Sequence, residues 1–313
     1  MSGAMQDIRD AYFDTVYEIG AADKNVIIIT NDMDVYSLRK FKENFPDRFI
    51  NVGVAEQNMI NVAAGLASCG KRPVVFGISS FVTFRCYEQL RFNVASMNLP
   101  VVIAGIGSGF AFSHDGPTHH GIQDVAVVRA IPGFTIYNPG DTVSAAACAQ
   151  LSMQARGPVF ARVDKGAFPA LHAPGSDFTK GFGILRPLSA TNILATGYML
   201  QPALAVADSL AARGLKVGVV DVFRLQPLVT PAFLAEVLAP SARIVTLEEN
   251  ALTGGLGSAL AEAITDRAAP CRLLRLATAD EQVLVYGSRE WLLARDKLDP
   301  ANLVERVRSF AAP

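Results

Sequence analysis

Three of the four histidines in this 313-residue chain lie within one short stretch of sequence. His114, His119 and His120 occur in the segment 113–121, whose glycine, proline, aspartate and threonine residues predict a loop. The loop follows an apolar run, 101–105, that predicts a buried strand. Because ligands of open parallel sheets bind beyond the carboxyl ends of strands, histidines and an aspartate placed there could hold a polar substrate and transfer protons. A solvated turn is the plain alternative.

The sequence does not favour two other kinds of site in this region. A zinc site is not favoured, because the helical His-Glu-x-x-His pattern is absent from the sequence and no cysteine is near the histidines. Gly105-Ile-Gly-Ser-Gly109 resembles a dinucleotide-binding glycine loop, but the full Gly-x-Gly-x-x-Gly spacing is missing. These glycines also run into a proline-containing loop instead of opening a helix, as a pyrophosphate site requires. We therefore exclude a nicotinamide-binding Rossmann site.

A glutamate and a group of aromatic residues are further candidates. Glu56 lies in Gly53-Val-Ala-Glu-Gln-Asn58, which turns a short strand, 49–52, into an apolar helix. The helix dipole favours a carboxylate in the first turn, so the spacing alone indicates a structural role. An aromatic side chain recurs every third position, a pattern more typical of a core than of a cofactor pocket. These aromatic residues are Phe81, Phe84 and Tyr87.

The elements that must position these residues follow from the hydrophobic pattern. Short β-branched runs alternate with longer helical patterns, which predicts βαβ units, parallel sheets and an α/β fold. In the first half the predicted strands are 26–30, 49–52, 73–77, 101–105, 134–137 and 159–163, and the predicted helices are 56–69, 84–97 and 142–154. In the second half the predicted strands are 192–195, 217–222, 243–247 and 271–276, and the predicted helices are 201–213 and 257–265.

A change of composition divides the chain. Residues 168–187 are rich in proline and glycine and have no clear period, which predicts an interdomain connection. We therefore expect two parallel-sheet-containing α/β domains, residues 1–172 and 191–313, joined by a linker over residues 173–190. Asp141, after Pro139-Gly140, is expected to cap the helix 142–154.

Composition excludes several classes of protein. Half of the residues are hydrophobic, and 28 basic residues face 29 acidic ones, which leaves no electrostatic footprint for nucleic acid or anionic lipid. No apolar run reaches the roughly 18 residues of a membrane span. The first ten residues lack the pattern of a signal peptide. Because the four cysteines have neither metal nor disulfide spacing, we expect a cytoplasmic protein.

Taken together, the three candidate segments resemble the pyrimidine-binding domain of transketolases. The order, spacing and contents match: Gly53-x-x-Glu-Gln-Asn-Met59, then Phe-x-x-Phe-x-x-Tyr, then Asp115-Gly-Pro-Thr-His119. Four later motifs resemble the C-terminal domain of the same family: Thr196-Gly197, Asp221-x-Phe-x-x-Gln-Pro227, Glu248-Glu-Asn250 and Gly254-Gly-Leu-Gly-Ser258. The resemblance covers nearly the whole chain and implies an enzyme that depends on thiamine diphosphate.

The resemblance implies only half of a cofactor site. In this family one domain holds the diphosphate and its divalent metal through a Gly-Asp-Gly motif followed by an asparagine, and another domain holds the aminopyrimidine. Gly-Asp-Gly does not occur in this chain. The diphosphate and a Mg²⁺ or Ca²⁺ ion would therefore be held by a separate N-terminal transketolase subunit. We expect two copies of each subunit, an α2β2 heterotetramer, with the pyrimidine site formed across subunits.

The resemblance also implies roles for residues on the cofactor side. Glu56 would hydrogen-bond the ring nitrogen of the pyrimidine and favour the imino tautomer, which takes the proton from the thiazolium carbon. Met33 would lie against the thiazolium, and Asp32 is a further candidate on the cofactor side. The pyrimidine would stack in an aromatic pocket formed by Phe81, Phe84 and Tyr87.

On the substrate side, Asp115 and His119 match residues that contact the hydroxyl groups and the reacting oxygen of a ketose donor. Arg162, in the strand 159–163, matches an arginine that binds the terminal phosphate of the substrate. Arg9 matches a second such arginine, with a solvated charge as the alternative. Guanidinium groups suit phosphate, and sulfonate or carboxylate nearly as well.

Three departures from the family pattern concern the anion pocket. Ordinary transketolases have a phosphate-binding histidine eight residues before the aspartate of Asp-Gly-Pro-Thr-His, where this chain has Gly107. His114 replaces an acidic residue and His120 replaces a glutamine, so both are candidate substrate contacts. We therefore expect a specialised sugar substrate, phosphorylated, sulfonated or phosphate-free, instead of a standard sugar of the pentose phosphate cycle.

The expected activity is transfer of a two-carbon ketol unit from a ketose to an aldehyde, with two alternatives. A decarboxylating carboligase resembling deoxyxylulose phosphate synthase also contains Asp-Gly-Pro-Thr-His-x-Gly. His120-Gly121 favours that enzyme slightly, whereas Gln57-Asn-Met59 favours transketolase. A non-catalytic scaffold subunit is the other alternative, but it would not need the glutamate, the aromatic residues and the histidine loop together.

Overall fold

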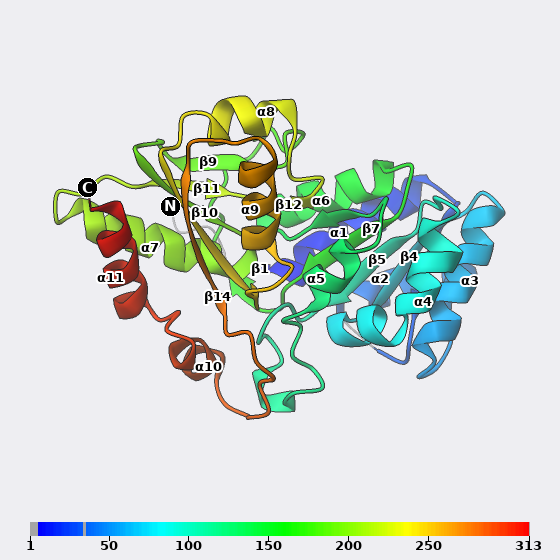
Figure 1. Ribbon diagram of the computed structural model, residues 1–313. Helices are drawn as coiled ribbons and strands as arrows, with labels where there is room; N and C mark the ends of the chain where they lie inside the picture. Colours follow the sequence, from blue (N-terminus) through cyan, green and yellow to red (C-terminus); the bar gives the residue numbers. More distant parts are fainter. Residues whose placement is uncertain (1–5, 34–35, 313) are drawn as a thin grey trace.

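The computed structural model describes residues 6–33 and 36–312. Most of these residues belong to two α/β units, each built on its own mainly parallel sheet (Figure 1). The architecture confirms the predicted fold class. Residues 1–5 and 313, at the outer ends of the two predicted domains, lie outside the described residues.

The first unit contains a seven-stranded sheet of order β12-β6-β7-β5-β4-β2-β3. Its strands are β2 (Val26–Thr30), β3 (Phe49–Asn51), β4 (Arg72–Ile78), β5 (Val102–Ile106), β6 (Thr135–Tyr137), β7 (Val159–Val163) and β12 (Arg224–Gln226). All neighbouring pairs are parallel except β12 and β6. The six parallel strands were each predicted to within one residue at either end, because their apolar runs are continuous and bounded by turn residues.

Helices cover both faces of this sheet. The strands β2, β5 and β7 are buried along their whole length, as expected for strands with helices on either side. On one face, α1 (Ile8–Ala22), α2 (Tyr36–Asn44) and α6 (Thr142–Gln154) share a core with alternate residues of β2 and β4. On the other face, α3 (Glu56–Ser68) and α5 (Asp124–Arg129) pack against the intervening residues.

One helix boundary and its cap are confirmed, and one predicted helix is irregular. Asp141 caps α6, accepting the Ser144 backbone N–H at 2.7 Å. The helix predicted over 84–97 is instead a short α4 (Tyr87–Gln89) between two π-helical turns, η2 (Phe81–Arg85) and η3 (Leu90–Ala95). The Thr83 hydroxyl donates to the Ser79 carbonyl at 2.7 Å, which competes with regular helical bonding.

The second unit contains a five-stranded sheet of order β14-β13-β10-β11-β9. Its strands are β9 (Gly183–Arg186), β10 (Thr191–Ala195), β11 (Gly218–Asp221), β13 (Arg243–Ala251) and β14 (Arg272–Thr278), and its helices include α7 (Leu200–Ala211), α9 (Leu256–Asp266), α10 (Arg289–Arg295) and α11 (Pro300–Ala311). One hydrophobic cluster runs from α3 and α5 of the first unit to α9 of the second. The two units therefore share part of their core.

Two strands correct the predicted division of the chain. β9 lies inside the range 173–190 predicted as a linker, and it pairs antiparallel with β11 at the sheet edge. The four residues of β9 lie among glycines and prolines, and a run of this length is too short to indicate a strand. β12 follows β11 but joins the first sheet, where Arg224 and Gln226 pair with Tyr137 and Ile136. This strand exists only because the two units dock, so no local pattern predicts it.

The described part of the chain can also be searched for membrane spans and disulfide bonds. None of the described helices is long and apolar enough to cross a bilayer. All four cysteines are free, and Cys86 and Cys148 are buried.

A buried histidine ties the connection between the units to both of them. His172 Nδ1 lies 3.2 Å from Asp141 Oδ1, and His172 Nε2 lies 3.5 Å from Asp221 Oδ2. Asp141 caps a helix of the first unit, and Asp221 ends a strand of the second. Asp141 also accepts the backbone N–H groups of Leu171 and His172. The cluster therefore links three segments that are far apart in sequence.

The pKa values of the three groups of this cluster are all shifted from their ordinary values. Burial alone would lower the pKa of His172, but the two carboxylates outweigh burial and raise this pKa. At Asp141, burial is outweighed by the hydrogen bonds of His172 and Ser144, which lower the pKa to about 2. At Asp221, burial dominates and raises the pKa to about 8. Asp141 is therefore ionised at neutral pH, whereas burial favours the protonated form of Asp221.

We predict that Asp221→Asn weakens the pH dependence of folding stability. The pKa of Asp221 is raised from 3.8 to about 8, so the folded chain keeps a proton that the unfolded chain loses, and stability falls as pH rises through this window. One retained proton corresponds to about 1.4 kcal/mol per pH unit. Urea unfolding at several pH values measures this slope. Asp208→Asn, at an exposed carboxylate of α7, is the control, and a variant with the wild-type slope would contradict the buried protonated carboxyl.

Candidate functional site

The predicted site residues gather at the carboxyl ends of the parallel strands of the first sheet. Asp32 and Met33 follow β2, the segment with the three aromatic residues follows β4, and the loop with three histidines follows β5. The chain passes from β3, on one side of β2, to β4 on the other side, so the strand order reverses beside β2. Such a switch point opens a crevice in which ligands bind.

Glu56 lies at this switch point. The short strand β3 delivers the chain to α3, of which Glu56 is the first residue, and its side chain is only 1% exposed. Asn31 Nδ2 donates to Oε1 at 2.9 Å, and Arg85 Nη1 donates to Oε2 at 2.7 Å. A glutamate that only begins a helix at the surface does not need a hydrogen-bond partner on each carboxylate oxygen. The surroundings of Glu56 therefore indicate a site that holds a charged hydrogen-bond acceptor.

The charge of Glu56 follows from these partners. Burial alone would raise the pKa of this carboxyl. The hydrogen bonds of its own backbone N–H, of Asn31 and of Arg85 outweigh burial and lower the pKa. Glu56 is therefore ionised at neutral pH and can accept a hydrogen bond from a protonated ring nitrogen.

The three predicted aromatic residues have different surroundings. The Phe81 ring is half-buried, and its centre lies 5.0 Å from that of His119 and 5.2 Å from the guanidinium carbon of Arg85. Phe84 is 39% exposed. Tyr87 is partly buried against the core of the first unit. Phe81 and Phe84 thus offer accessible ring surface next to the partners of Glu56.

The histidine loop, residues 113–121, is fastened at its base. Gly109 and Gly121 exchange two backbone hydrogen bonds of 3.0 and 2.8 Å. Ser80, at the end of β4, donates its hydroxyl to the Thr118 carbonyl at 2.9 Å. The loop is therefore tied to β4 as well as to β5, next to the segment that carries the aromatic residues.

The structure places the polar residues of the histidine loop in two environments. His119 is half-buried between Phe81 and Phe112, and its Nδ1 lies 2.9 Å from Thr118 Oγ1. His114 and Asp115 are exposed. The structure thus brings His119 to the aromatic segment and leaves His114 and Asp115 open to a substrate.

His120 does not fit the predicted contact with a substrate. Its side chain is buried, and its ring lies edge-on to Phe110 with 5.1 Å between the ring centres. Burial lowers the pKa of His120, only partly offset by the backbones of Ser113 and Val283. The neutral ring therefore belongs to the packing between the histidine loop and the second unit.

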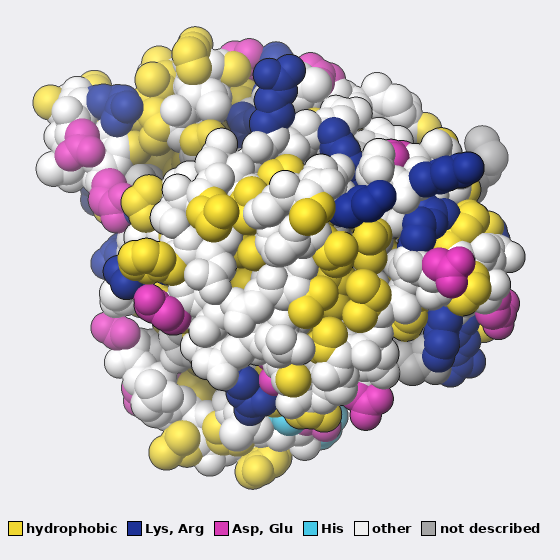
Figure 2. All heavy atoms as spheres, turned by 90° about the vertical axis from the view of Figure 1, so that its right-hand side faces the viewer, with side chains coloured by type: hydrophobic (Ala, Val, Ile, Leu, Met, Phe, Trp, Pro, Cys, Tyr) yellow, Lys and Arg dark blue, Asp and Glu magenta, His cyan; other side chains and the backbone are white. Residues whose placement is uncertain are grey.

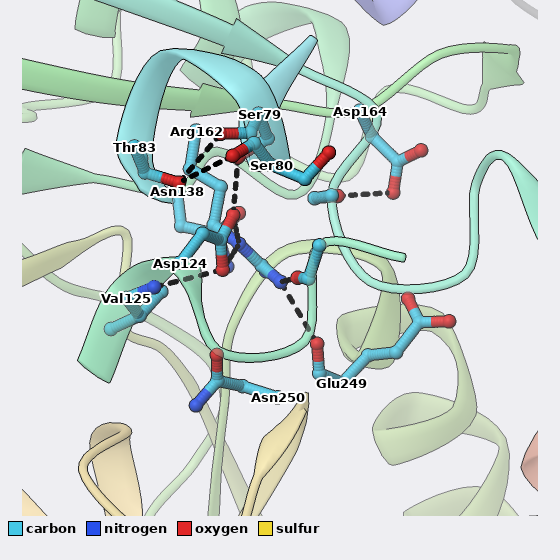
Figure 3. Close-up of polar contacts among 12 residues, drawn as sticks. Ser79, Ser80, Thr83, Asp124, Val125, Asn138, Arg162, Asp164, Glu249 and Asn250 are labelled. Carbon is cyan, nitrogen blue, oxygen red and sulfur yellow. Dashed lines mark hydrogen bonds and ion pairs between the residues drawn. The ribbon is translucent and has the colours of Figure 1, made fainter. Parts of the chain in front are cut away.

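Arg162 is also buried, which does not fit the predicted contact with a substrate phosphate. Its Nε donates to both oxygens of Asp124 at 3.0 and 2.8 Å (Figure 3). Its Nη2 donates to the carbonyls of Gly121 at 2.7 Å and Glu249 at 2.9 Å. The Ser79 hydroxyl completes the network by donating to Asp124 at 2.5 Å. Arg162 therefore joins β7, α5, the histidine loop and β13.

The three remaining predicted residues lie at the margin of the site. Asp32, with φ of 66°, is exposed and exchanges hydrogen bonds with Asn51. Met33 is half-buried against the core beneath α1. Arg9 is partly buried and pairs with Asp7 at 3.4 Å and Asp10 at 3.7 Å. Asp32 and Met33 directly follow Asn31 and so flank the switch point.

Sequence reasoning missed both partners of Glu56. Arg85 lies between Phe84 and Cys86. A positively charged residue within this aromatic segment was the one feature of the sequence that could have indicated a partner for a carboxylate. No spacing rule connects Asn31 with residue 56, because their contact arises from two different strand ends. Asp124 was missed for the same reason: its partner Arg162 is brought to it by the sheet.

These residues fit the aminopyrimidine half of thiamine diphosphate. The cofactor ring needs an acceptor for its ring nitrogen and a flat apolar surface, and Glu56, Phe81 and Phe84 supply both. In addition, Asn31 Oδ1 is buried without a hydrogen-bond partner among the described residues. A buried oxygen in that state has spare accepting capacity for a donor from outside the chain.

Comparisons with known proteins agree with this geometry. Residues 4–170 match the family of the transketolase pyrimidine-binding domain, and residues 183–303 match that of the transketolase C-terminal domain. A 6-deoxy-6-sulfo-D-fructose transketolase subunit from a Clostridium species is 34% identical, covering 87% of this chain and 85% of its own. An apulose-4-phosphate transketolase subunit from Phocaeicola vulgatus is 29% identical over 99% of both chains.

Longer relatives match as well. The 1-deoxy-D-xylulose-5-phosphate synthase of Syntrophotalea carbinolica is 34% identical over 98% of this chain, but the chain spans only 49% of that enzyme. Among solved structures, a split-gene transketolase in an inactive β4 tetramer matches with a TM-score of 0.85 and 30% identity over 98% of both chains. The chain belongs to the transketolase family and comprises its pyrimidine-binding and C-terminal domains.

Proposed function

We propose that this chain is the C-terminal subunit of a thiamine diphosphate-dependent transketolase that transfers a two-carbon ketol unit from a ketose donor to an aldehyde acceptor. The observation that carries the proposal is the buried, ionised Glu56 at the switch point, beside accessible aromatic rings and His119. Two relatives that match most of the chain are named as transketolase subunits.

The chemistry divides between cofactor and chain. Thiamine diphosphate supplies a nucleophilic carbon and an electron sink for breaking and forming carbon–carbon bonds. Glu56 accepts a hydrogen bond from the pyrimidine ring nitrogen, and its lowered pKa keeps it ionised for this task. The Arg85 side chain is 51% exposed and binds the second oxygen of Glu56 from the solvent side. The Glu56 carboxylate would therefore be shared between Arg85 and the pyrimidine ring of the cofactor.

On the substrate side, His119 holds or moves a proton at the reacting oxygen of the donor. Its ring is oriented by Thr118 and packs edge-on against Phe81. Asp115, exposed on the same loop, binds a donor hydroxyl. Because the histidine loop is fastened to β4 and β5, these two side chains keep a defined position relative to Glu56.

The missing half of the cofactor site calls for a second subunit. The sequence has no Gly-Asp-Gly motif, and two relatives that this chain covers over most of their length are named as transketolase subunits. Figure 2 shows hydrophobic side chains gathered on one face of the first unit. Exposed apolar residues of the first unit include Val54, Phe84, Phe92 and Met97. Exposed apolar surface of this kind suits a permanent contact with another chain.

We propose an α2β2 assembly in which the N-terminal subunit holds the diphosphate and a Mg²⁺ or Ca²⁺ ion. The solved relative that consists of β chains alone is inactive, which fits a chain with only half of the site. The free, partly buried cysteines suit a reducing cytoplasm.

The substrate class that the site supports is an anionic ketose. The two transketolase relatives are named for a sulfonated and a phosphorylated sugar. Gly107 has φ of +85°, and a Cβ there would lie 2.0 Å from the Phe112 ring, so the histidine of ordinary transketolases does not fit. With Arg162 buried, the positive charge for the anion is offered by Arg9 and by Lys165 after β7, whose Nζ lies 4.0 Å from the Phe112 ring centre.

A decarboxylating carboligase is the second candidate function. Deoxyxylulose phosphate synthases are as similar in sequence as the transketolase subunits, and this chain shares His120-Gly121 with the pattern of those enzymes. Release of carbon dioxide from pyruvate by the reconstituted enzyme would favour the carboligase, and transfer from a ketose without it would favour the transketolase.

Capture of tagged chain from its native lysate, with thiamine diphosphate and Mg²⁺ added, tests the need for a partner. We expect a stoichiometric second protein that contains Gly-Asp-Gly and a downstream asparagine. If the chain is recovered alone and still binds the cofactor, the two-subunit proposal is wrong. If it is recovered alone and binds nothing, a non-catalytic scaffold becomes the better interpretation.

Glu56→Gln is predicted to abolish turnover while the fold stays intact. The amide cannot carry the charge that stabilises a protonated ring nitrogen, so we expect kcat to fall roughly 10²- to 10⁴-fold. Steady-state kinetics of the two-subunit enzyme measure this loss, and thermal unfolding checks the fold. Glu88→Gln, at an exposed glutamate of the neighbouring α4, should leave kcat unchanged. An active Glu56→Gln enzyme would remove Glu56 from this role.

Asp115→Ala and His119→Ala are predicted to impair use of the donor while thiamine diphosphate binds nearly as before. Both side chains belong to the histidine loop and face the substrate side, so KM for the ketose should rise or kcat should fall. Titration calorimetry with the cofactor provides the second readout. Asp177→Ala, at an exposed aspartate outside the site, is the control. An equal loss of cofactor affinity would count against a substrate role.

A further inference from the structure

Arg289, at the start of α10 in the second unit, lies between carboxylates of both units. Its Nη1 and Nη2 donate to Asp164, after β7, at 3.1 and 2.6 Å. Its Nε donates to Glu249, in β13, at 3.0 and 3.2 Å. The guanidinium carbon also lies 3.6 Å from the ring centre of Tyr198. Burial alone would lower the pKa of Arg289, but the two carboxylates outweigh burial and raise it, so the side chain stays charged.

Both carboxylates hold the segment that leads into the histidine loop. Asp164 accepts the Ser108 hydroxyl at 2.8 Å, and Glu249 accepts the Phe110 backbone N–H at 3.1 Å. Between these two contacts, Gly109 has φ of +57°, and a Cβ there would lie 2.3 Å from the Glu249 carboxyl carbon. The backbone of residues 108–110 therefore rests directly on the groups that Arg289 holds.

This short segment sets the base of the histidine loop. Gly109 pairs with Gly121 through two backbone hydrogen bonds, so the start and the end of the loop move together. Arg162 Nη2 also donates both to the Glu249 carbonyl, a contact drawn in Figure 3, and to the Gly121 carbonyl at the end of the loop. A shift of residues 108–110 or of Glu249 would therefore be passed to both ends of the loop.

The connection that leads into α10 touches the histidine loop at two more places. The Tyr286 ring packs on Gly116, where a Cβ would lie 2.2 Å from Cε1. The backbone of Val283 lies beside the buried ring of His120. In Figure 1 the β14–α10 connection runs alongside the β5–α5 connection, which contains the histidine loop. The second unit thus contacts the histidine loop itself as well as the segment at its base.

We propose that Arg289 is a positioning residue for the histidine loop: through Asp164 and Glu249 it fixes residues 108–110 and thereby the place where His119 and Asp115 meet the donor. The second unit then takes part in substrate binding without touching the substrate. The consequence for catalysis rests on the proposed transketolase function, whereas the effect on the loop can be measured without it.

The first test is the ¹³C–¹H spectrum of the histidine rings in the full chain. The chain has only four histidines, and single His→Gln variants assign each signal. In Arg289→Met the signals of His119 and His120 should move by more than a linewidth, while that of His172, held by Asp141 and Asp221, should stay. Arg289→Lys keeps the charge but cannot bond both carboxylates through several nitrogens, so it should give smaller shifts in the same direction.

A matched control lies on the same helix. Arg295 pairs with Glu281 and Asp296 and has no contact with Asp164 or Glu249 among the described ion pairs, so Arg295→Met should leave the signals of His119 and His120 in place. Unshifted His119 and His120 signals in Arg289→Met would overturn the proposal. If Arg289→Met fails to fold, Arg289→Lys decides by the same criterion.

The second test uses the complex of this chain with its diphosphate-binding partner, thiamine diphosphate and Mg²⁺. Arg289→Met should lower kcat/KM for the ketose donor by up to about a hundredfold, mainly through KM, with cofactor affinity unchanged and Arg289→Lys in between. An unchanged kcat/KM, or an equal loss of cofactor affinity, would contradict the positioning role. Lack of activity in the wild-type complex would refute the proposed function, and the histidine signals would still decide the role of Arg289.

Discussion

The buried ion pair between Arg162 and Asp124 is the contact on which the arrangement of the site depends. Arg162 extends from the strand β7 of the first sheet and meets the start of α5, the end of the histidine loop and β13 of the second unit. A buried pair of this kind adds little net stability, but removal of one partner costs about 3–5 kcal/mol because the other charge remains unpaired. The role of this ion pair is geometric, because four segments of the chain come together at the Arg162 guanidinium. An arginine used in this way is not free to bind a substrate.

Glu56 shows how the same sheet supports a charge for chemistry. Its carboxylate is nearly inaccessible, yet it stays ionised because one oxygen is bonded by Asn31 and the other by Arg85. The partners come from the end of β2 and from the π-helical turn after β4, on either side of the switch point. One of them, Arg85, is half exposed, and accessible aromatic rings lie next to it. The site is thus closed toward the interior of the chain and open toward solvent.

The two units act as one body around this site. They share a hydrophobic cluster, a strand of the second half completes the sheet of the first, and His172 bridges carboxylates of both. The adjacent glutamates of the second unit have separate structural tasks. Glu248 accepts the backbone N–H groups of Leu256 and Gly257 at 2.8 Å and so caps α9, whereas Glu249 supports the base of the histidine loop. The motif that identifies the C-terminal domain is therefore explained by helix capping and contact between units.

The sequence by itself determined the α/β class, the parallel strands, the Asp141 cap and the family. Each of these depends on local information: a continuous apolar run, a capping residue or a short motif at fixed spacing. The sequence also drew attention to Glu56, the aromatic residues and His119, which the structure brings to one switch point. Only the tertiary structure decided that β9 and β12 are strands, that His120 and Arg162 are buried, that Asn31 and Arg85 bind Glu56, and that Arg289 joins Asp164 to Glu249. These features arise where segments far apart in sequence meet, and a side chain's partners there depend on how sheets and units dock, which no local pattern records.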